Sequence, residues 1–138
     1  LLAELRAAMA QRVTSLLLVA SRTKSLAIGA EAVDTAVAKG QAHLVLVPSA
    51  FTHTTGQAHW ELLVRARALD NVVWVGAAAQ AGEHDNGRRT WGHSIWVDPW
   101  GQVVACQPQQ AACVVADLSM LTLRERRMQM PALNTASV

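Results

Sequence analysis

Apolar and polar positions alternate along this 138-residue chain with two different periods, which predicts both helices and strands. In residues 1–20 the apolar positions recur every three or four residues, as on one face of an amphipathic helix. A second helix is predicted over Ala30–Lys39, and Gly40 is well placed to end it because glycine readily adopts the left-handed conformation. The first 40 residues therefore favour a helical segment.

A third helix is predicted over Gln57–Leu69, with Thr54 or Thr55 available as its cap. Its apolar side is expected to consist of Leu62, Leu63, Ala66 and Leu69.

Short runs of β-forming residues predict strands on both sides of this helix. Residues 43–48 (HLVLVP) and 71–80 (NVVWVGAAAQ) are apolar throughout most of their length, which is typical of strands buried on both faces of a sheet. A polar loop follows in residues 81–92, where Asn86 and Gly87 indicate a turn.

The last third of the chain contains a predicted hairpin, a strand and a helix. Residues 93–98 and 102–106 flank Pro99-Trp100-Gly101, as the two arms of a hairpin would. A last strand is predicted at 113–117, and a short helix at Leu121–Met128. The order of elements predicts an α/β or α+β sandwich.

Composition excludes several classes of protein without naming a function. Apolar residues make up 51% of the chain and charged residues 16%, which fits one globular domain rather than a disordered chain. The formal charge of +2 is far below the positive charge typical of nucleic-acid binding. No apolar stretch is long enough for a membrane span, and the first ten residues do not form a signal peptide. With only two cysteines, a cytoplasmic location is expected.

Three blocks of sequence carry a family resemblance: LVLVPSAFTHTTGQAHWELLVRARALDN, VGAAAQAGEHDNGRRTWGHSIWVDPWGQVVAC, and RERRMQMPAL after VVADLSML. Over about residues 42–133 the chain resembles the C-terminal half of a nitrilase-superfamily carbon–nitrogen hydrolase, in the branch of omega-amidase and the Nit proteins. The resemblance implies an α/β fold: a truncated half of an α-β-β-α sandwich, with helices on one face of its sheet. Because half a sandwich leaves an apolar face open, we expect a homodimer or higher homo-oligomer to complete it.

The same resemblance implies chemistry that this chain lacks in part. The family hydrolyses amides or nitriles with a cysteine nucleophile, a lysine and two glutamates. Glu61, in the AHWE motif, matches the second glutamate, which implies a concave, partly dry setting for it. No cysteine precedes Cys106, and Lys24, Lys39 and Glu31 do not stand in the family's motifs. The family mechanism is therefore expected to be absent.

Residues 1–41 do not resemble the family and are of unclear origin, so the predicted single domain over residues 1–138 is chimeric. Residues 13–47 are loosely similar to L7Ae/L30e-type RNA-binding proteins, in which Lys24, Gly29 and Glu31 would meet RNA. RNA binding is therefore an alternative function, although the net charge does not favour nucleic acid as a partner.

The remaining candidates for chemistry are a carboxylate and several histidines. Glu61 is the candidate general base, with His59 and His93 as further catalytic candidates. No cofactor is expected, but zinc or manganese could bind the set His53, His84 and Asp85. The alternatives are a solvated Glu61 paired with Arg65 at i+4 and histidines that only pack and hydrogen-bond.

Both thiols are interpreted as small buried side chains at strand ends, Cys106 in one strand and Cys113 in the next. The predicted function is accordingly weak hydrolysis of an activated ester, amide or phosphoester of small size, carried out by Glu61 or by a histidine-bound metal. A folded chain with no selected activity is the remaining alternative.

Overall fold

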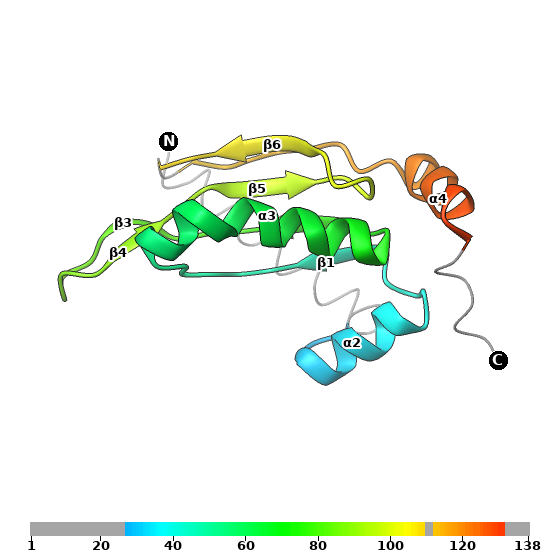
Figure 1. Ribbon diagram of the computed structural model, residues 1–138, viewed down its shortest axis with the longest axis horizontal. Helices are drawn as coiled ribbons and strands as arrows, with labels where there is room; N and C mark the ends of the chain where they lie inside the picture. The colour runs from blue at the N-terminus through cyan, green and yellow to red at the C-terminus, as the bar shows by residue number, and fades with distance from the viewer. Residues whose placement is uncertain (1–26, 110–111, 132–138) are drawn as a thin grey trace, which may run out of the picture. The chain divides into compact units, whose positions relative to one another are not determined.

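The computed structural model describes residues 27–109 and 112–131, so the helix predicted over residues 1–20 lies outside the described part. The chain divides into two units, Leu1–Ala36 and Val37–Val138, and the strands all belong to the second (Figure 1). None of the described helices is both long and apolar enough to cross a membrane. The elements in chain order are α2 (Ala30–Ala38), β1 (Leu44–Leu46), α3 (His53–Asn71), β2 (Trp74–Ala77), β3 (Ala81–Glu83), β4 (Arg89–Trp91), β5 (Ser94–Val97), β6 (Val103–Gln107) and α4 (Met120–Gln129).

The main sheet of the second unit has four strands in the order β1-β2-β5-β6. The first two strands run parallel, with Leu46 opposite Gly76, and the other pairs are antiparallel. The hairpin predicted around Pro99-Trp100-Gly101 is confirmed as β5 and β6. The mixed sheet with its helices confirms the α/β class.

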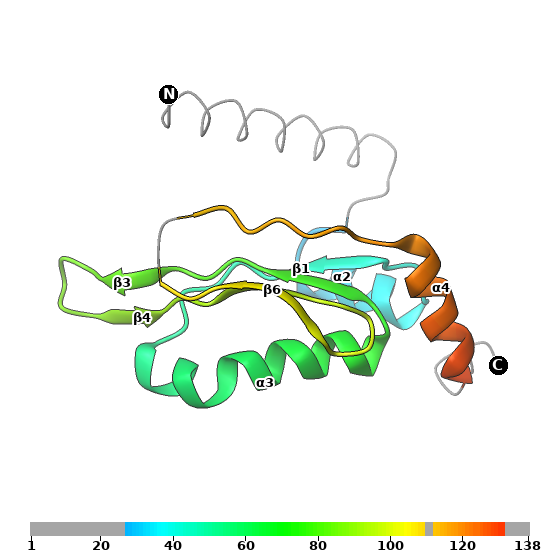
Figure 2. The same ribbon diagram turned by 90° about the horizontal axis from the view of Figure 1, so that it is seen from above.

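Helix α3 covers one face of this sheet, as Figure 2 shows. Its buried residues recur every four positions and differ from those that periodicity predicted: Gly56, Trp60, Val64 and Ala68. The predicted apolar side was therefore wrong, and Leu62 is 67% exposed. The helix has two apolar stripes. The stripe that contains Gly56 and Ala68 faces the sheet, because these small residues let the backbones of the helix and the strands approach each other. A methyl group at Gly56 would collide with Trp91.

Strand β1 is less buried than its sequence predicts. Val45 packs against the core under α3, whereas Leu44 and Leu46 point to the other face and are exposed. The prediction of burial on both faces is wrong for this strand, because α3 covers only one of them. It is confirmed for β2, in which every residue is buried.

Residues 112–119, which we term the strap, run over the sheet face opposite α3 (Figure 2). The indole of Trp96 donates a hydrogen bond of 3.0 Å to the carbonyl of Val114, and that of Trp74 donates one of 3.2 Å to Ser119. The strand predicted at 113–117 is therefore wrong: this segment is not assigned to a strand. Hydrogen bonds from two tryptophan side chains fix this segment to the sheet, whereas a strand would be held by backbone hydrogen bonds to its neighbour.

The predicted polar loop contains a second, two-stranded sheet formed by β3 and β4. Its turn closes with hydrogen bonds from His84 N to Arg88 O and from Gly87 N to His84 O. Gly87 has a φ of +76°, a value that favours glycine. The turn predicted at Asn86-Gly87 is thus confirmed, within a hairpin that the sequence analysis treated as irregular.

The helix predicted at Leu121–Met128 is confirmed as α4, and its Arg127 joins three parts of the second unit. The guanidinium donates hydrogen bonds of 3.1 Å to the carbonyls of Val72 and Gly40, and a third to Ala42. These carbonyls lie just after α3 and just before β1. Desolvation lowers the pKa of Arg127 below its ordinary value, but a guanidinium remains charged.

We expect Arg127→Ala to lower the free energy of unfolding by about 2 kcal/mol, because three carbonyls lose a charged donor. Arg127→Lys should recover only part of this loss, since an ammonium group cannot reproduce the planar fork of donors. The urea midpoint measures the effect. Arg124→Ala, on an exposed position of the same helix, is the matched control and should change little. Equal midpoints for the two alanine variants would contradict the assignment.

Candidate functional site

An open hollow of about 530 Å³ lies where the parallel strands β1 and β2 end. In open α/β sheets, ligands commonly bind just beyond the carboxyl ends of the strands. The residues that line the hollow come from the segments after β1 and β2 and from the start of β5: Pro48, Ser49, Ala50, Ala78, Ala79, Gln80 and Ser94.

Hydrogen bonds fix the rim of this hollow. The Ser94 hydroxyl accepts a bond of 3.0 Å from the backbone N–H of Ala79 and donates one of 3.3 Å to its carbonyl. The Ser49 N–H donates to the carbonyl of Ala78 at 2.8 Å, and the Gln80 N–H donates to the carbonyl of Ser49 at 2.9 Å. The two strand ends are thus tied to each other and to β5.

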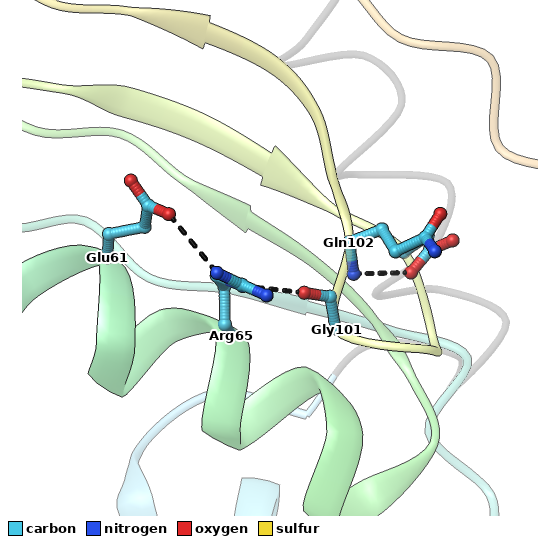
Figure 3. Close-up of polar contacts among 5 residues, drawn as sticks. Glu61, Arg65, Gly101 and Gln102 are labelled. Carbon is cyan, nitrogen blue, oxygen red and sulfur yellow. Dashed lines mark hydrogen bonds and ion pairs between the residues drawn. The ribbon is translucent and has the colours of Figure 1, made fainter.

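Glu61 lies away from the hollow, on an exposed part of α3. Its side chain is 60% exposed, and its Oε1 is 3.4 Å from Nη1 of Arg65. Arg65 Nε in turn donates a hydrogen bond of 2.8 Å to the carbonyl of Gly101 (Figure 3). The alternative of a solvated carboxylate paired at i+4 fits this geometry, and the concave setting implied by the resemblance does not.

A side chain of the β5–β6 turn itself also stabilises the turn that Arg65 contacts. Asp98, a buried residue, accepts hydrogen bonds at Oδ1 from the backbone N–H groups of Trp100 at 2.9 Å and Gln102 at 2.8 Å. Figure 3 shows the Gln102 bond beside the Arg65 contact. Arg65 and Asp98 therefore both stabilise the β5–β6 turn.

The two histidines proposed for catalysis are in different surroundings. His59 is exposed on α3. The ring of His93 stacks on Trp91 with centroids 4.2 Å apart, and the His93 carbonyl accepts a hydrogen bond of 2.7 Å from the indole of Trp60. Neither histidine lines the hollow or forms a hydrogen bond or ion pair with Glu61 in the described part of the chain.

The proposed metal ligands do not form a cluster. His53 packs edge-on against Trp91 at 5.1 Å, and His84 Nε2 is 2.9 Å from the Thr90 hydroxyl. Asp85 is exposed in the turn between β3 and β4. In residues 27–109 and 112–131, no three histidine, cysteine, aspartate or glutamate side chains gather where they could hold a metal ion.

Both cysteines are exposed, so the prediction of buried thiols is wrong. Cys106 pairs with Ile95 across the β5–β6 ladder and therefore lies on the α3 side of the sheet edge. Partial burial raises the pKa of the Cys106 thiol, and the negative charge of Glu61 raises it further. Neither Cys106 nor Cys113 lines the hollow.

We expect Glu61→Gln to speed alkylation of Cys106 by iodoacetamide at pH 8 by about twofold, since the thiolate is the reactive form. Removing the nearby negative charge lowers the pKa of the thiol, which increases the thiolate fraction. The rate is measured in a Cys113→Ala background so that one thiol reacts. Asp70→Asn, another exposed carboxylate of α3, is the control. An unchanged rate in Glu61→Gln would show that the carboxylate does not act on this thiol.

The residues of the hollow were missed by sequence analysis, which selected ionisable side chains. Ser49 directly follows the first predicted apolar strand and Gln80 ends the second, and that position was the available signal. Ser94 joins them only through the pairing of β2 with β5.

Comparison with known proteins decides the family. The sequence profile described as carbon–nitrogen hydrolase matches residues 28–128. The chain belongs to this family. The match begins at Ile28, upstream of the expected start near Ala42, and so includes much of the stretch 13–47 that was compared with L7Ae. Binding to RNA remains a prediction.

Two relatives that are named for different amidase activities match this chain. The deaminated glutathione amidase of Yersinia enterocolitica is 45% identical over 92 residues, which are 67% of this chain and 32% of the relative. The omega-amidase of Xenopus tropicalis is 47% identical over 88 residues, which are 64% of this chain and 32% of the relative. The chain thus spans about a third of the length of these relatives.

A solved structure supports the fold. Saccharomyces cerevisiae Nit3, described as a member of the nitrilase superfamily, has a TM-score of 0.68 and 33% identity to this chain. The similarity covers 76% of this chain and 40% of that one. The resemblance noted in the sequence is therefore confirmed, and the described sheet and helices correspond to part of a nitrilase-type fold.

Proposed function

We propose that this chain forms the substrate-binding part of a carbon–nitrogen hydrolase that acts on small amides. The observation that carries the proposal is the hollow at the carboxyl ends of β1 and β2, in a chain that belongs to this family. The hydrogen bonds of Ser94 to Ala79 support it, because a binding site benefits from a fixed rim.

In this proposal neither Cys106 nor Cys113 is the nucleophile, because neither lines the hollow. Hydrolysis by Glu61 or by a histidine-bound metal, as predicted from the sequence, has less support. Glu61 is exposed and paired with Arg65, and the ligands proposed for zinc or manganese lie apart. We therefore assign amide binding, and not the chemical step, to the described residues.

We expect Ala78→Leu to weaken binding of butyramide at least about tenfold, because the larger side chain fills part of the hollow. Isothermal titration calorimetry on the full chain measures the affinity. Ala58→Leu, on an exposed position of α3 outside the hollow, is the matched control and should bind as the original chain does. Alkylation of both thiols should also leave binding unchanged. Equal weakening in both leucine variants would refute the placement of the site.

We also propose that the chain forms a homodimer through the sheet face opposite α3. Leu46 is 55% exposed on this face, and Val115 of the strap is 77% exposed. Together with Leu44 they leave apolar surface in water, which self-association would bury. Trp74 is not part of this surface, because the strap covers it.

We expect a dimer mass for the chain by light scattering at micromolar concentration, and a monomer mass for Leu46→Lys. A charged side chain at a buried contact loses its hydration without compensation. Leu62→Lys, on the outer side of α3, is the control and should remain dimeric. A monomer mass for the original chain rules out the dimer, and dissociation of Leu62→Lys alone places the contact on α3 instead.

A further inference from the structure

The lining of the hollow contains three polar side chains and no ionisable one. A ligand that enters the hollow loses contacts with water and gains contacts with serine, glutamine, alanine and proline atoms. A carboxylate in this position would lose hydration without a cation to offset the loss, whereas a neutral polar group needs only hydrogen bonds. The lining therefore favours an uncharged ligand group.

Most polar groups of the lining already have partners. The Ser94 hydroxyl bonds both backbone groups of Ala79. The carbonyl of Gln80 accepts a hydrogen bond of 2.9 Å from Gly92 N–H, and its own N–H donates to Ser49. The side-chain carboxamide of Gln80 forms no hydrogen bond within the described part of the chain, and Gln80 is exposed at the hollow. It is thus available to a ligand.

The backbone of Gln80 is held on two sides, so its side chain starts from a fixed point. Ser49 accepts from its N–H, and Gly92 donates to its carbonyl. Gly92 has a φ of +76°, and a methyl group there would collide with the carbonyl of Pro108 and with Ala81. The link between β4 and β5 therefore packs closely against Ala81, the residue that follows Gln80.

A carboxamide has a donor and an acceptor side by side, which is the same pattern that a primary amide ligand presents. Two such groups can form a pair of hydrogen bonds, with each NH₂ donating to the other carbonyl oxygen. A carboxylate has only acceptors, so it can take the glutamine NH₂ but leaves the glutamine oxygen without a donor. The carboxylate is the group that remains after an amide is hydrolysed.

We propose that Gln80 is a specificity-determining residue of the hollow, which pairs with the carboxamide of the substrate and discriminates against the carboxylate of the product. The inference rests on the proposed function of the hollow. It adds that the discrimination comes from one neutral side chain, because the lining holds no charge that could repel or attract the acid. A site of this kind binds the uncleaved amide and releases the acid.

The test is an NMR titration of the isotope-labelled 138-residue chain with butyramide and with butyrate. The backbone amide signals of Ser49, Ala79 and Gln80 report the binding. We expect butyramide to bind about threefold to tenfold more tightly than butyrate, as one additional hydrogen bond allows. In Gln80→Met, which keeps the length of the side chain without its polar group, the two affinities should become equal. Gln57→Met, on an exposed position of α3, is the control and should keep the preference.

A second variant, Gln80→Glu, should bind butyramide more weakly than the original chain and butyrate hardly at all, since like charges repel. Urea midpoints equal to that of the original chain show that the variants are folded. If Gln80→Met binds butyramide at the same signals and keeps the preference, Gln80 is not the specificity residue, although the hollow remains the site. If butyramide moves none of these signals in the original chain, the proposed function fails, and the role of Gln80 fails with it.

Discussion

The packing of the second unit depends mainly on the contact between α3 and the two central strands, β2 and β5. Trp60 belongs to this contact. Its ring belongs to the buried cluster that includes Val75 of β2 and Ile95 and Val97 of β5, and its indole N–H donates to the carbonyl of His93 at 2.7 Å. His93 has a φ of +60°, an unfavourable value for a residue with a side chain, so a strong contact has to hold it. His93 directly precedes Ser94, whose hydroxyl binds Ala79 at the end of β2. A core residue thus positions the rim of the hollow through two hydrogen bonds.

Much of the fold could be predicted from the period of the apolar residues, and the failures have physical causes. The strand β2 and the β5–β6 hairpin were found because a continuous apolar run and a turn motif are local signals. The buried side of α3 was not, because the helix has two apolar stripes and side-chain size alone favours the wrong one. Gly56 and Ala68 are buried because they are small, a property that matters only when a sheet lies against them. The strap was taken for a strand because its sequence favours one, but two indole donors hold it instead.

The candidate site was harder to predict than the fold because its residues become neighbours only after the strands pair. The register that sets Leu46 opposite Gly76 brings the segments after β1 and β2 together, although about 30 residues of α3 and its connections separate them in the chain. The family could be recognised from ordered blocks of sequence, and the profile match confirms it. Recognition also drew attention to Glu61, because charged residues carry the known chemistry of the family. The structure places that carboxylate beside Arg65 on an exposed part of α3, away from the hollow.

Three charged side chains of the second unit stabilise the backbone, and none of them lines the neutral hollow. Arg65 binds the carbonyl of Gly101, and Arg127 binds one carbonyl just after α3 and two just before β1. The carboxylate of Asp98 accepts hydrogen bonds from two backbone N–H groups in its own turn. Each ionic group completes the hydrogen bonding of a turn or of a helix end, where backbone groups lack partners from regular structure. At the hollow, parallel strand ends and the Ser94 hydroxyl satisfy the backbone without any charge. Arg65, Asp98 and Arg127 therefore lie where turns and a helix end are held, whereas the uncharged residues beyond β1 and β2 line the hollow proposed to bind a ligand.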